Sequence, residues 1–196
     1  MNRSDVKELH YIAPIDNVSS IMEHGILSNQ RASRLPHRSV AMQEIQERRQ
    51  DKRIPNARPL HEYVNLYFDA HNPMLSKCRA HNDNICVLRV DHTLIDRSRV
   101  IVTDKNAAKD YVRFYPVADG LQALNKDLVF AQFWLNRDDP FDEQYRRGVK
   151  CAEVLVPDSV SPDLVIGAYV ANQKALTAFK ELRTRLPVVI NGSMFF

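Results

Sequence analysis

The chain has 196 residues; 44% are hydrophobic and 26% are charged, with only five glycines and ten prolines. These proportions are those of a globular protein with a packed core, and they exclude collagen-like and low-complexity classes. The formal net charge of +3 excludes a uniformly basic nucleic-acid binder. The length favours a single domain over residues 1–196.

Two features bear on where the protein acts. The three cysteines, Cys78, Cys86 and Cys151, form no C-x-x-C pair, and an odd number without a framework indicates free thiols in a reducing compartment. The first residues show no signal-peptide pattern, and no segment approaches the ~20 apolar residues of a membrane helix. The sequence therefore predicts a cytoplasmic protein without a membrane partner.

Short apolar runs alternate with a few helical patterns along the chain. Strands are predicted over 9–13, 26–27, 63–68, 85–90, 100–104, 151–156, 165–170 and 188–190. Helices are predicted from Asp16, as an N-cap, to Gly25, as the C′ residue; from Ser39 to residue 53, ended by Pro55; and over 121–128 and 172–186. The segments 28–39 and 136–147 are expected to be loops. Many short strands with few helices indicate an α+β fold or a mixed sheet.

One carboxylate lies inside the most apolar of these strands. Every residue from Cys151 to Val156 except Glu153 is apolar, which is typical of a strand covered on both faces. An ionised carboxylate is costly to bury without a partner or a function. Two interpretations stand: a structural salt bridge to one of the arginines, or a functional carboxylate whose replacement by alanine leaves the fold intact.

Positive charge is concentrated in one segment. Residues 31–58 carry eight cations against three acids, a net charge of +5, so the rest of the chain is slightly acidic. Such a segment suits a phosphate-bearing partner, either a nucleic acid or a pyrophosphate cofactor. Within it, Arg48 continues the apolar stripe of the predicted helix, whereas Lys52 and Arg53 fit a solvated helix face.

Several common catalytic motifs are missing from the sequence. It contains no G-x-G-x-x-G, no G-x-x-x-x-G-K-[ST] and no G-x-S-x-G, which argues against Rossmann and P-loop sites and against a serine nucleophile elbow. The seven histidines include no H-x-x-x-H or H-E-x-x-H pair, so no metal is expected. Cys151 lies in a predicted buried strand and is expected to be a core residue rather than a nucleophile.

Four motifs occur in the order that a known family shows. They are His10 in the first strand, Ile45-Gln46-Glu47-Arg48-Arg49 followed by Pro55, the strand 63–68 followed by Pro73-Met74-Leu75, and Ala152-Glu153-Val154-Leu155-Val156. Further matches are Asp16-Asn17, Thr103-Asp104, Arg113-Phe114 and the aromatic residues near position 196. Over almost the whole chain the sequence resembles the DarT family of DNA ADP-ribosyltransferases, the toxins of DarT–DarG toxin–antitoxin pairs.

The resemblance implies a fold, an activity and partners. The fold is that of an ADP-ribosyltransferase: a split, mostly antiparallel core of two packed sheets with flanking helices, and with NAD+ in the cleft between the sheets. The activity is mono-ADP-ribosylation of a base in single-stranded DNA, with NAD+ as the co-substrate. The implied partner is a DarG-type macrodomain antitoxin. The family includes branches that modify thymine and guanine, so the target base stays open.

The same resemblance assigns roles to residues. Glu153 corresponds to the catalytic glutamate, and Arg48 corresponds to the arginine needed for NAD+ handling and for activation of the base. The implied cofactor-binding residues are Arg48, Asn17, His10 at the adenosine-side ribose, and Tyr67 and Phe68 on the strand that lines the nicotinamide pocket. Segments 28–53 and 136–150 correspond to the element that folds over NAD+ and to the substrate-recognition loop.

Charge and aromatic character predict the DNA contacts. Arginine and lysine side chains bind phosphates, and aromatic rings stack on bases. The residues predicted to contact DNA are Arg31, Arg34, Arg38, Tyr145, Arg146, Arg147 and Lys150. Two alternatives remain: an ADP-ribosyltransferase that acts on RNA or protein, and a non-catalytic nucleic-acid-binding module in which Glu153 is structural.

Overall fold

The computed structural model describes residues 1–38 and 43–196, and the side chains of all of these except 43–46. Ser39, the predicted N-cap of a helix, lies outside the described residues. The strands are β1 (Glu8–Pro14), β2 (Ile26–Leu27), β3 (Tyr63–Tyr67), β4 (Ile85–Asp91), β5 (Ile101–Thr103), β6 (Phe114–Pro116), β7 (Glu153–Pro157), β8 (Ser159–Val160), β9 (Val165–Val170) and β10 (Val188–Ile190). The α-helices are α1 (Val18–His24), α2 (Asn29–Ala32), α3 (Gln43–Gln50), α4 (Pro73–Lys77), α5 (Val117–Ala123), α6 (Lys126–Val129), α7 (Pro140–Val149) and α8 (Gln173–Glu181). Shorter 3-10 helices cover Arg3–Asp5, Ile15–Asn17, Leu60–Glu62, Arg79–His81, His92–Asp96, Pro162–Leu164 and Gly192–Met194.

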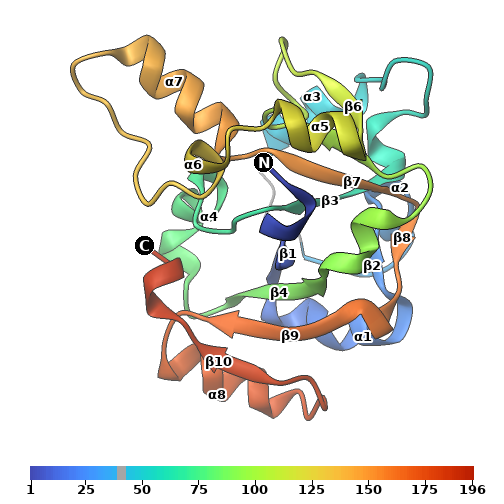
Figure 1. Cartoon of the computed structure of the whole chain (residues 1–196). Coiled ribbons are helices and arrows are strands. Elements are labelled where there is room, and N and C mark those ends of the chain that lie inside the picture. Colours follow the sequence, from blue (N-terminus) through green and yellow to red (C-terminus); the bar gives the residue numbers. More distant parts are fainter. Residues whose placement is uncertain (39–42) are drawn as a thin grey trace.

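Most of the strands belong to one large sheet. Within the described residues, it is eight-stranded in the order β10-β9-β4-β1-β3-β7-β5-β6, and β2 and β8 form a second, two-stranded sheet. Neighbouring strands of the large sheet are antiparallel, except that β10 runs parallel to β9. Figure 1 shows β10, β9, β4, β3 and β7 following one another from the foot of the view upward, with α8 beside β10. The expected mostly antiparallel α+β fold is confirmed.

The large sheet is divided in the middle. β1 and β4 pair in an unbroken register from Glu8↔Asp91 to Pro14↔Ile85. By contrast, β1 and β3 share a single pair of residues, His10↔Tyr67. Two half-sheets, β10-β9-β4-β1 and β3-β7-β5-β6, are therefore joined at one point. This divided sheet matches the split core that the family resemblance implies.

The two faces of the sheet carry separate hydrophobic clusters. The larger one contains Leu9, Val64 and Val154 from neighbouring strands, and it is covered by apolar residues of α1, α5 and α8. The opposite face carries a smaller cluster that includes Ile12 and Tyr67. Side chains alternate between the faces of a strand, so β1, β3 and β4 contribute to both clusters. The second face is the one on which Glu153 lies, because Glu153 pairs with Tyr67 in the register of β3 and β7.

Helix ends follow the sequence signals in part. Gly25 ends α1 with a positive φ of 86°, as expected of a C′ glycine, and an added Cβ there would lie 2.3 Å from the carbonyl oxygen of Val160. Asp16 does not cap α1, contrary to prediction. It lies inside the 3-10 helix Ile15–Asn17, so the chain is already helical where the cap was expected.

The region predicted to be a charged loop contains a helix instead. The side chain of Asp139 accepts hydrogen bonds from the backbone N–H groups of Phe141 and Asp142, and Pro140 is the first helical residue of α7. Both features favour helix initiation. Figure 1 shows α7 and the loop before it standing away from the large sheet. In the described part of the chain, every helix is too short or too polar to cross a membrane.

Candidate active site

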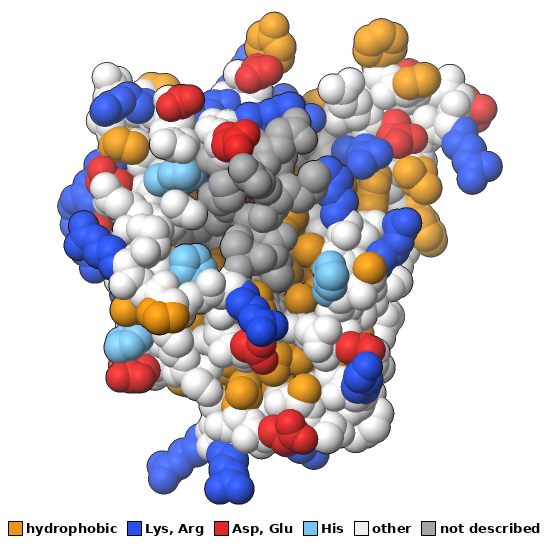
Figure 2. Space-filling model, turned by 180° about the vertical axis from the view of Figure 1, so that it is seen from behind, with side chains coloured by type: hydrophobic (Ala, Val, Ile, Leu, Met, Phe, Trp, Pro, Cys, Tyr) orange, Lys and Arg blue, Asp and Glu red, His pale blue; other side chains and the backbone are white. Residues whose placement is uncertain are grey.

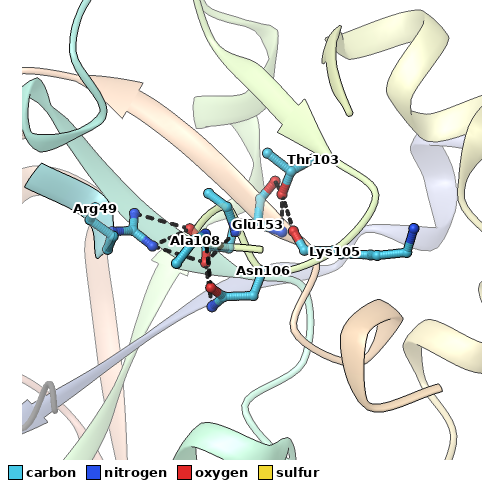
Figure 3. A network of polar contacts seen from close by, with 7 residues as sticks. Arg49, Thr103, Lys105, Asn106, Ala108 and Glu153 are labelled. Atoms are coloured by element: carbon cyan, nitrogen blue, oxygen red, sulfur yellow. Dashed lines mark hydrogen bonds and ion pairs between the residues drawn. The ribbon is translucent and has the colours of Figure 1, made fainter. Parts of the chain in front are cut away.

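Glu153 is the first residue of β7, and its side chain is completely buried. Arg49, in the last turn of α3, donates from Nη1 to both carboxylate oxygens and from Nη2 to Oε2, each at 3.2 Å. The Arg49 side chain is only 6% exposed. Figure 3 shows the guanidinium reaching the carboxylate from one side. A guanidinium that donates hydrogen bonds to both carboxylate oxygens is the partner that a buried carboxylate needs.

The loop that follows β5 holds the same carboxylate from the other side. The Asn106 side-chain amide donates to Oε1 at 2.8 Å, and the Ala107 backbone N–H donates to Oε1 at 3.2 Å. The backbone N–H of Glu153 donates to the Thr103 hydroxyl at 3.0 Å (Figure 3). Both the carboxylate and the backbone of Glu153 are therefore fixed by residues 103–107.

Burial dominates the electrostatics of this cluster. It raises the pKa of Glu153, while the charge of Arg49 and the hydrogen bond from Ala107 act in the opposite direction. Burial and the neighbouring Glu153 raise the pKa of Tyr67 well above its usual value. The same two causes raise the pKa of Cys151 to about 12, so Cys151 stays a thiol at neutral pH.

His10, Tyr67 and Glu153 form a row across three strands. Tyr67 is the cross-strand partner of His10 in β1 and of Glu153 in β7. Directly paired residues have their Cβ atoms about 5 Å apart on one face of a sheet. The His10 Nε2 atom lies 3.0 Å from the Glu8 carboxylate, and its buried Nδ1 has no hydrogen-bond partner among the described residues. Nδ1 is closed off from solvent in this structure.

A cavity of about 360 Å³ opens between the two half-sheets. Arg49 and Asn106 line it, and Glu153 lies directly behind these two side chains. Its volume is within the range of small-molecule and cofactor sites. The residues predicted from the sequence that line it are Asn17, Arg38, Arg48, Tyr67 and Arg147.

The predicted cofactor residues are distributed unevenly around this cavity. The Asn17 amide donates to the Arg38 carbonyl at 2.6 Å and accepts from the Arg38 N–H at 3.1 Å. Arg48 is exposed at the cavity, but it is Arg49 that contacts Glu153. Phe68, the residue directly after β3, lies in the larger hydrophobic cluster, whereas Tyr67 lies in the smaller cluster on the opposite face.

The residues predicted to contact DNA differ from one another in their exposure and in their ion pairs. Arg34 is exposed, Arg31 pairs with Asp158 at 3.2 Å, and Arg146 and Arg147 pair with acids one turn earlier in α7. Tyr145 is half exposed, with the Lys105 Nζ 5.7 Å from its ring centre.

Lys150 requires a correction. Its side chain is fully buried, with Nζ paired to the Asp69 carboxylate and donating to the Val129 carbonyl at 3.0 Å. A buried lysine that is already paired offers no ammonium to a DNA phosphate. The sequence shows only a lysine after two arginines, and the turn at the end of α7 directs it inward.

Sequence reasoning missed two residues of the site. Arg49 is adjacent to the predicted Arg48, and only the rotation of α3 about its axis decides which one faces Glu153. Asn106 lies in a polar loop and carries no periodic signal; its place after β5, which pairs with β7, was the only available hint. In the described part of the chain, acidic, histidine and cysteine side chains form no group that could hold a metal.

A split sheet, a cleft between its halves and a buried glutamate held by an arginine agree with the ADP-ribosyltransferase fold that the family resemblance implies. The family model described as "ssDNA thymidine ADP-ribosyltransferase, DarT" matches residues 10–196. The chain belongs to the DarT family.

Two relatives and one solved structure illustrate the similarity. A DNA ADP-ribosyl transferase–DNA ADP-ribosyl glycohydrolase fusion protein of Thermosipho africanus is 29% identical over 201 residues, which cover 97% of this chain and 50% of the relative. A DNA ADP-ribosyl transferase of Thermus sp. is 27% identical over 159 residues, covering 76% of this chain and 73% of the relative. The solved structure of Thermosipho africanus DarTG in complex with ADP-ribose superposes on this chain with a TM-score of 0.84. The two sequences are 28% identical, and the match covers 97% of this chain and 51% of that one. The chain thus spans about half the length of the fusion relative.

Proposed function

We propose that the protein is an NAD+-dependent mono-ADP-ribosyltransferase that modifies a base in single-stranded DNA. The observation that carries this proposal is the buried Glu153 carboxylate, held behind a cavity of about 360 Å³ by Arg49 and Asn106. Membership of the DarT family and the activity named for the Thermosipho and Thermus relatives support it. The description of the family model favours thymidine as the target.

The reaction explains why a carboxylate is needed. The bond between the nicotinamide nitrogen and the ribose C1′ breaks, and nicotinamide leaves with the electron pair. A ring nitrogen of the DNA base bonds to C1′ and loses its proton. Positive charge develops on the ribose, as in glycoside cleavage, and a carboxylate in a cleft shielded from water stabilises it. Glu153 is the residue that we assign to this role.

Arg49 is the guanidinium that we assign beside Glu153, because it is the arginine in contact with the carboxylate. A guanidinium keeps its proton at any physiological pH, so its role is electrostatic: it stabilises a deprotonated base or binds a phosphate. Arg48, exposed at the same cavity, remains the proposed residue for NAD+ handling.

The cofactor contacts are proposed from the position of each residue and from hydrogen-bonding atoms that have no partner among the described residues. His10 has a buried Nδ1 available to a ribose hydroxyl, while Glu8 engages its Nε2. Asn17 and Tyr67 line the cavity and are kept as NAD+ contacts. Phe68 is not kept, because it lies in the opposite core.

The DNA path is proposed along the cavity mouth and α7. Arg147 lines the main cavity and also a second one of about 340 Å³, which contains Lys109 and Asn136. Figure 2 shows hydrophobic side chains beside lysine and arginine side chains on the upper-right lobe, where α7 lies in this reversed view. Aromatic rings beside cations suit a single strand, whose bases stack and whose phosphates are charged. The residues kept as DNA contacts are the exposed Arg31, Arg34, Arg38, Tyr145 and Arg147 and the half-buried Arg146.

We also propose that the protein is the toxin of a toxin–antitoxin pair that acts in the cytoplasm. The fusion of a DNA ADP-ribosyl transferase to a DNA ADP-ribosyl glycohydrolase in the Thermosipho relative supports a macrodomain-type antitoxin that removes the modification.

Incubation with NAD+ and a panel of single-stranded oligonucleotides, read by mass spectrometry, tests the proposal. We expect one ADP-ribose to be added to DNA, with thymidine-containing oligonucleotides preferred and Glu153→Gln inactive. Modification of RNA or protein alone would favour the first alternative. DNA binding without nicotinamide release would favour the non-catalytic module.

A further inference from the structure

The two carboxylate oxygens of Glu153 have different surroundings. Oε1 accepts from Asn106 at 2.8 Å, from the Ala107 N–H at 3.2 Å and from Arg49 at 3.2 Å. Oε2 accepts from Arg49 alone among the residues that the structure describes. If Arg49 turns toward a substrate, Oε1 keeps two donors and Oε2 is released.

The orientation of the Asn106 amide follows from its other contact. The backbone N–H of Ala108 donates to the side-chain oxygen of Asn106 at 3.0 Å. A backbone N–H can only donate, so the amide oxygen must face Ala108 and the NH₂ group must face Glu153. Asn106 is therefore fixed as a donor to the carboxylate.

The loop that carries Asn106 is itself held on several sides. The Thr103 hydroxyl donates to the Lys105 carbonyl at 2.6 Å, and the Arg113 N–H donates to the Asp104 carboxylate at 2.9 Å. Lys105 packs against Gly148 of α7, where an added Cβ would lie 3.3 Å from its Cδ. These contacts keep Asn106 in place independently of α3, which carries Arg49.

We propose that Asn106 is a positioning residue for the transfer reaction: with the Ala107 N–H it fixes Oε1 of Glu153, so that Oε2 is the oxygen presented to the substrate. This proposal rests on the function proposed above. Asn106 lines the cavity but acts through Glu153, so its loss is expected to change turnover more than NAD+ binding.

Two substitutions test this role. Asn106→Ala removes the donor, and Asn106→Asp keeps the size but places a second carboxylate beside Oε1. We expect kcat to fall about 10- to 100-fold in Asn106→Ala, the size of one hydrogen bond to a charged group, with the KM for NAD+ little changed. Asp110→Asn is the matched control, because Asp110 is an exposed residue of the same loop. It should behave as wild type.

The pH profile separates positioning from general damage to the fold. The titratable groups that face Glu153 are Arg49 from α3, Tyr67 from β3 and Cys151 before β7, and all of them stay in the variants. Donors to a carboxylate favour its ionised form, and a second carboxylate opposes it. The acidic limb of kcat should therefore move to higher pH in Asn106→Ala and further in Asn106→Asp.

A titration of the Glu153 carboxyl carbon by NMR, without substrates, gives a second readout that needs no activity. We expect a higher pKa for Glu153 in both Asn106 variants than in the Asp110→Asn control. Wild-type kcat and pH profile in a folded Asn106→Ala, or an unmoved carboxyl titration, would overturn the proposal. An inactive wild-type enzyme would instead count against the proposed function, and the NMR titration would still decide the role of Asn106.

Discussion

Arg49 and Glu153 form an ion pair in which the guanidinium bonds both carboxylate oxygens at 3.2 Å, and the exposed fractions of the two side chains are 6% and 0%. Charges buried to this degree depend on each other, because either one alone would lie unpaired in a poorly solvated place. The pair links α3 to β7. Replacement of either residue is therefore expected to lower both stability and activity.

Replacement of Glu153 is predicted to abolish transfer. Glu153→Gln keeps the size of the side chain and most of its contacts but loses the charge that stabilises the ribose. We expect NAD+ to bind and oligonucleotide modification to be lost when measured by mass spectrometry. Glu153→Ala should in addition destabilise the fold by about 3–5 kcal/mol, because Arg49 is left unpaired. The sequence alone suggested an intact fold in this variant. A denaturant midpoint equal to that of wild type would contradict the structural argument.

Arg49 and Arg48 are neighbours in α3 and make a matched pair of variants. Arg49→Ala leaves the buried carboxylate without its cation, and we expect the turnover number to fall by at least about 100-fold. Arg48→Ala removes an exposed guanidinium at the cavity and should act mainly on the KM for NAD+. Steady-state kinetics on both variants measure the difference. The opposite pattern, with Arg48→Ala inactive and Arg49→Ala nearly normal, would return the catalytic role to Arg48.

Lys150 is predicted to be a structural residue. Lys150→Met leaves Asp69 without its buried partner, which should cost about 3–5 kcal/mol in the free energy of unfolding. The double variant Lys150→Met/Asp69→Leu should recover part of that loss, because both charges are then removed. Binding of single-stranded DNA by the folded protein should keep its wild-type dependence on salt. A flatter dependence would show that Lys150 contacts phosphates.

Arg147 is predicted to contact the DNA backbone. In Arg147→Ala the logarithm of the binding constant should depend less steeply on the logarithm of the salt concentration, by about 0.7 per lost phosphate contact. Lys180→Ala is the control, since Lys180 is exposed on α8 beside β10. Fluorescence anisotropy with a labelled oligonucleotide measures both slopes. Equal slopes in wild type and Arg147→Ala would move the DNA path away from α7.

Acid should weaken the fold through Glu8. Burial acts to raise the pKa of Glu8, but hydrogen bonds from His10 and Arg89 outweigh it and lower the pKa to about 2. A carboxylate whose pKa is lowered by folding stabilises the folded state at every pH above its pKa in the unfolded chain, which is near 4.5. That contribution is lost as the pH falls from 4.5 toward 2. Over this pH range the midpoint temperature of thermal unfolding should fall more steeply for wild type than for Glu8→Gln.

Much of the fold could be predicted because strands leave a local signal. The apolar runs at β4, β7 and β9 are dense enough to mark buried strands, and Gly25 marks the end of α1. The helix α7 was missed because its residues are mostly polar and two of its apolar side chains, Phe141 and Tyr145, are exposed. Its start was nevertheless encoded in the Asp139-Pro140 pair, which is a capping signal rather than a periodic one.

The site could be predicted only where one residue stands out chemically. Glu153 does so, as the single charge in an apolar strand. Which of Arg48 and Arg49 faces it depends on the rotation of α3, and the inward turn of Lys150 depends on the end of α7; neither is a local property. Asn106 is brought to Glu153 by the pairing of β5 with β7, a contact between residues 47 positions apart in the chain.

A crystal structure with a non-hydrolysable NAD+ analogue tests the central claim most directly. We predict that Oε2 of Glu153 will lie within hydrogen-bonding distance of a hydroxyl of the nicotinamide-side ribose, with Asn106 still on Oε1 and Arg49 in contact with the ligand. An analogue bound in the cleft with that ribose far from Glu153, and with the Arg49–Glu153 pair still closed, would contradict the account.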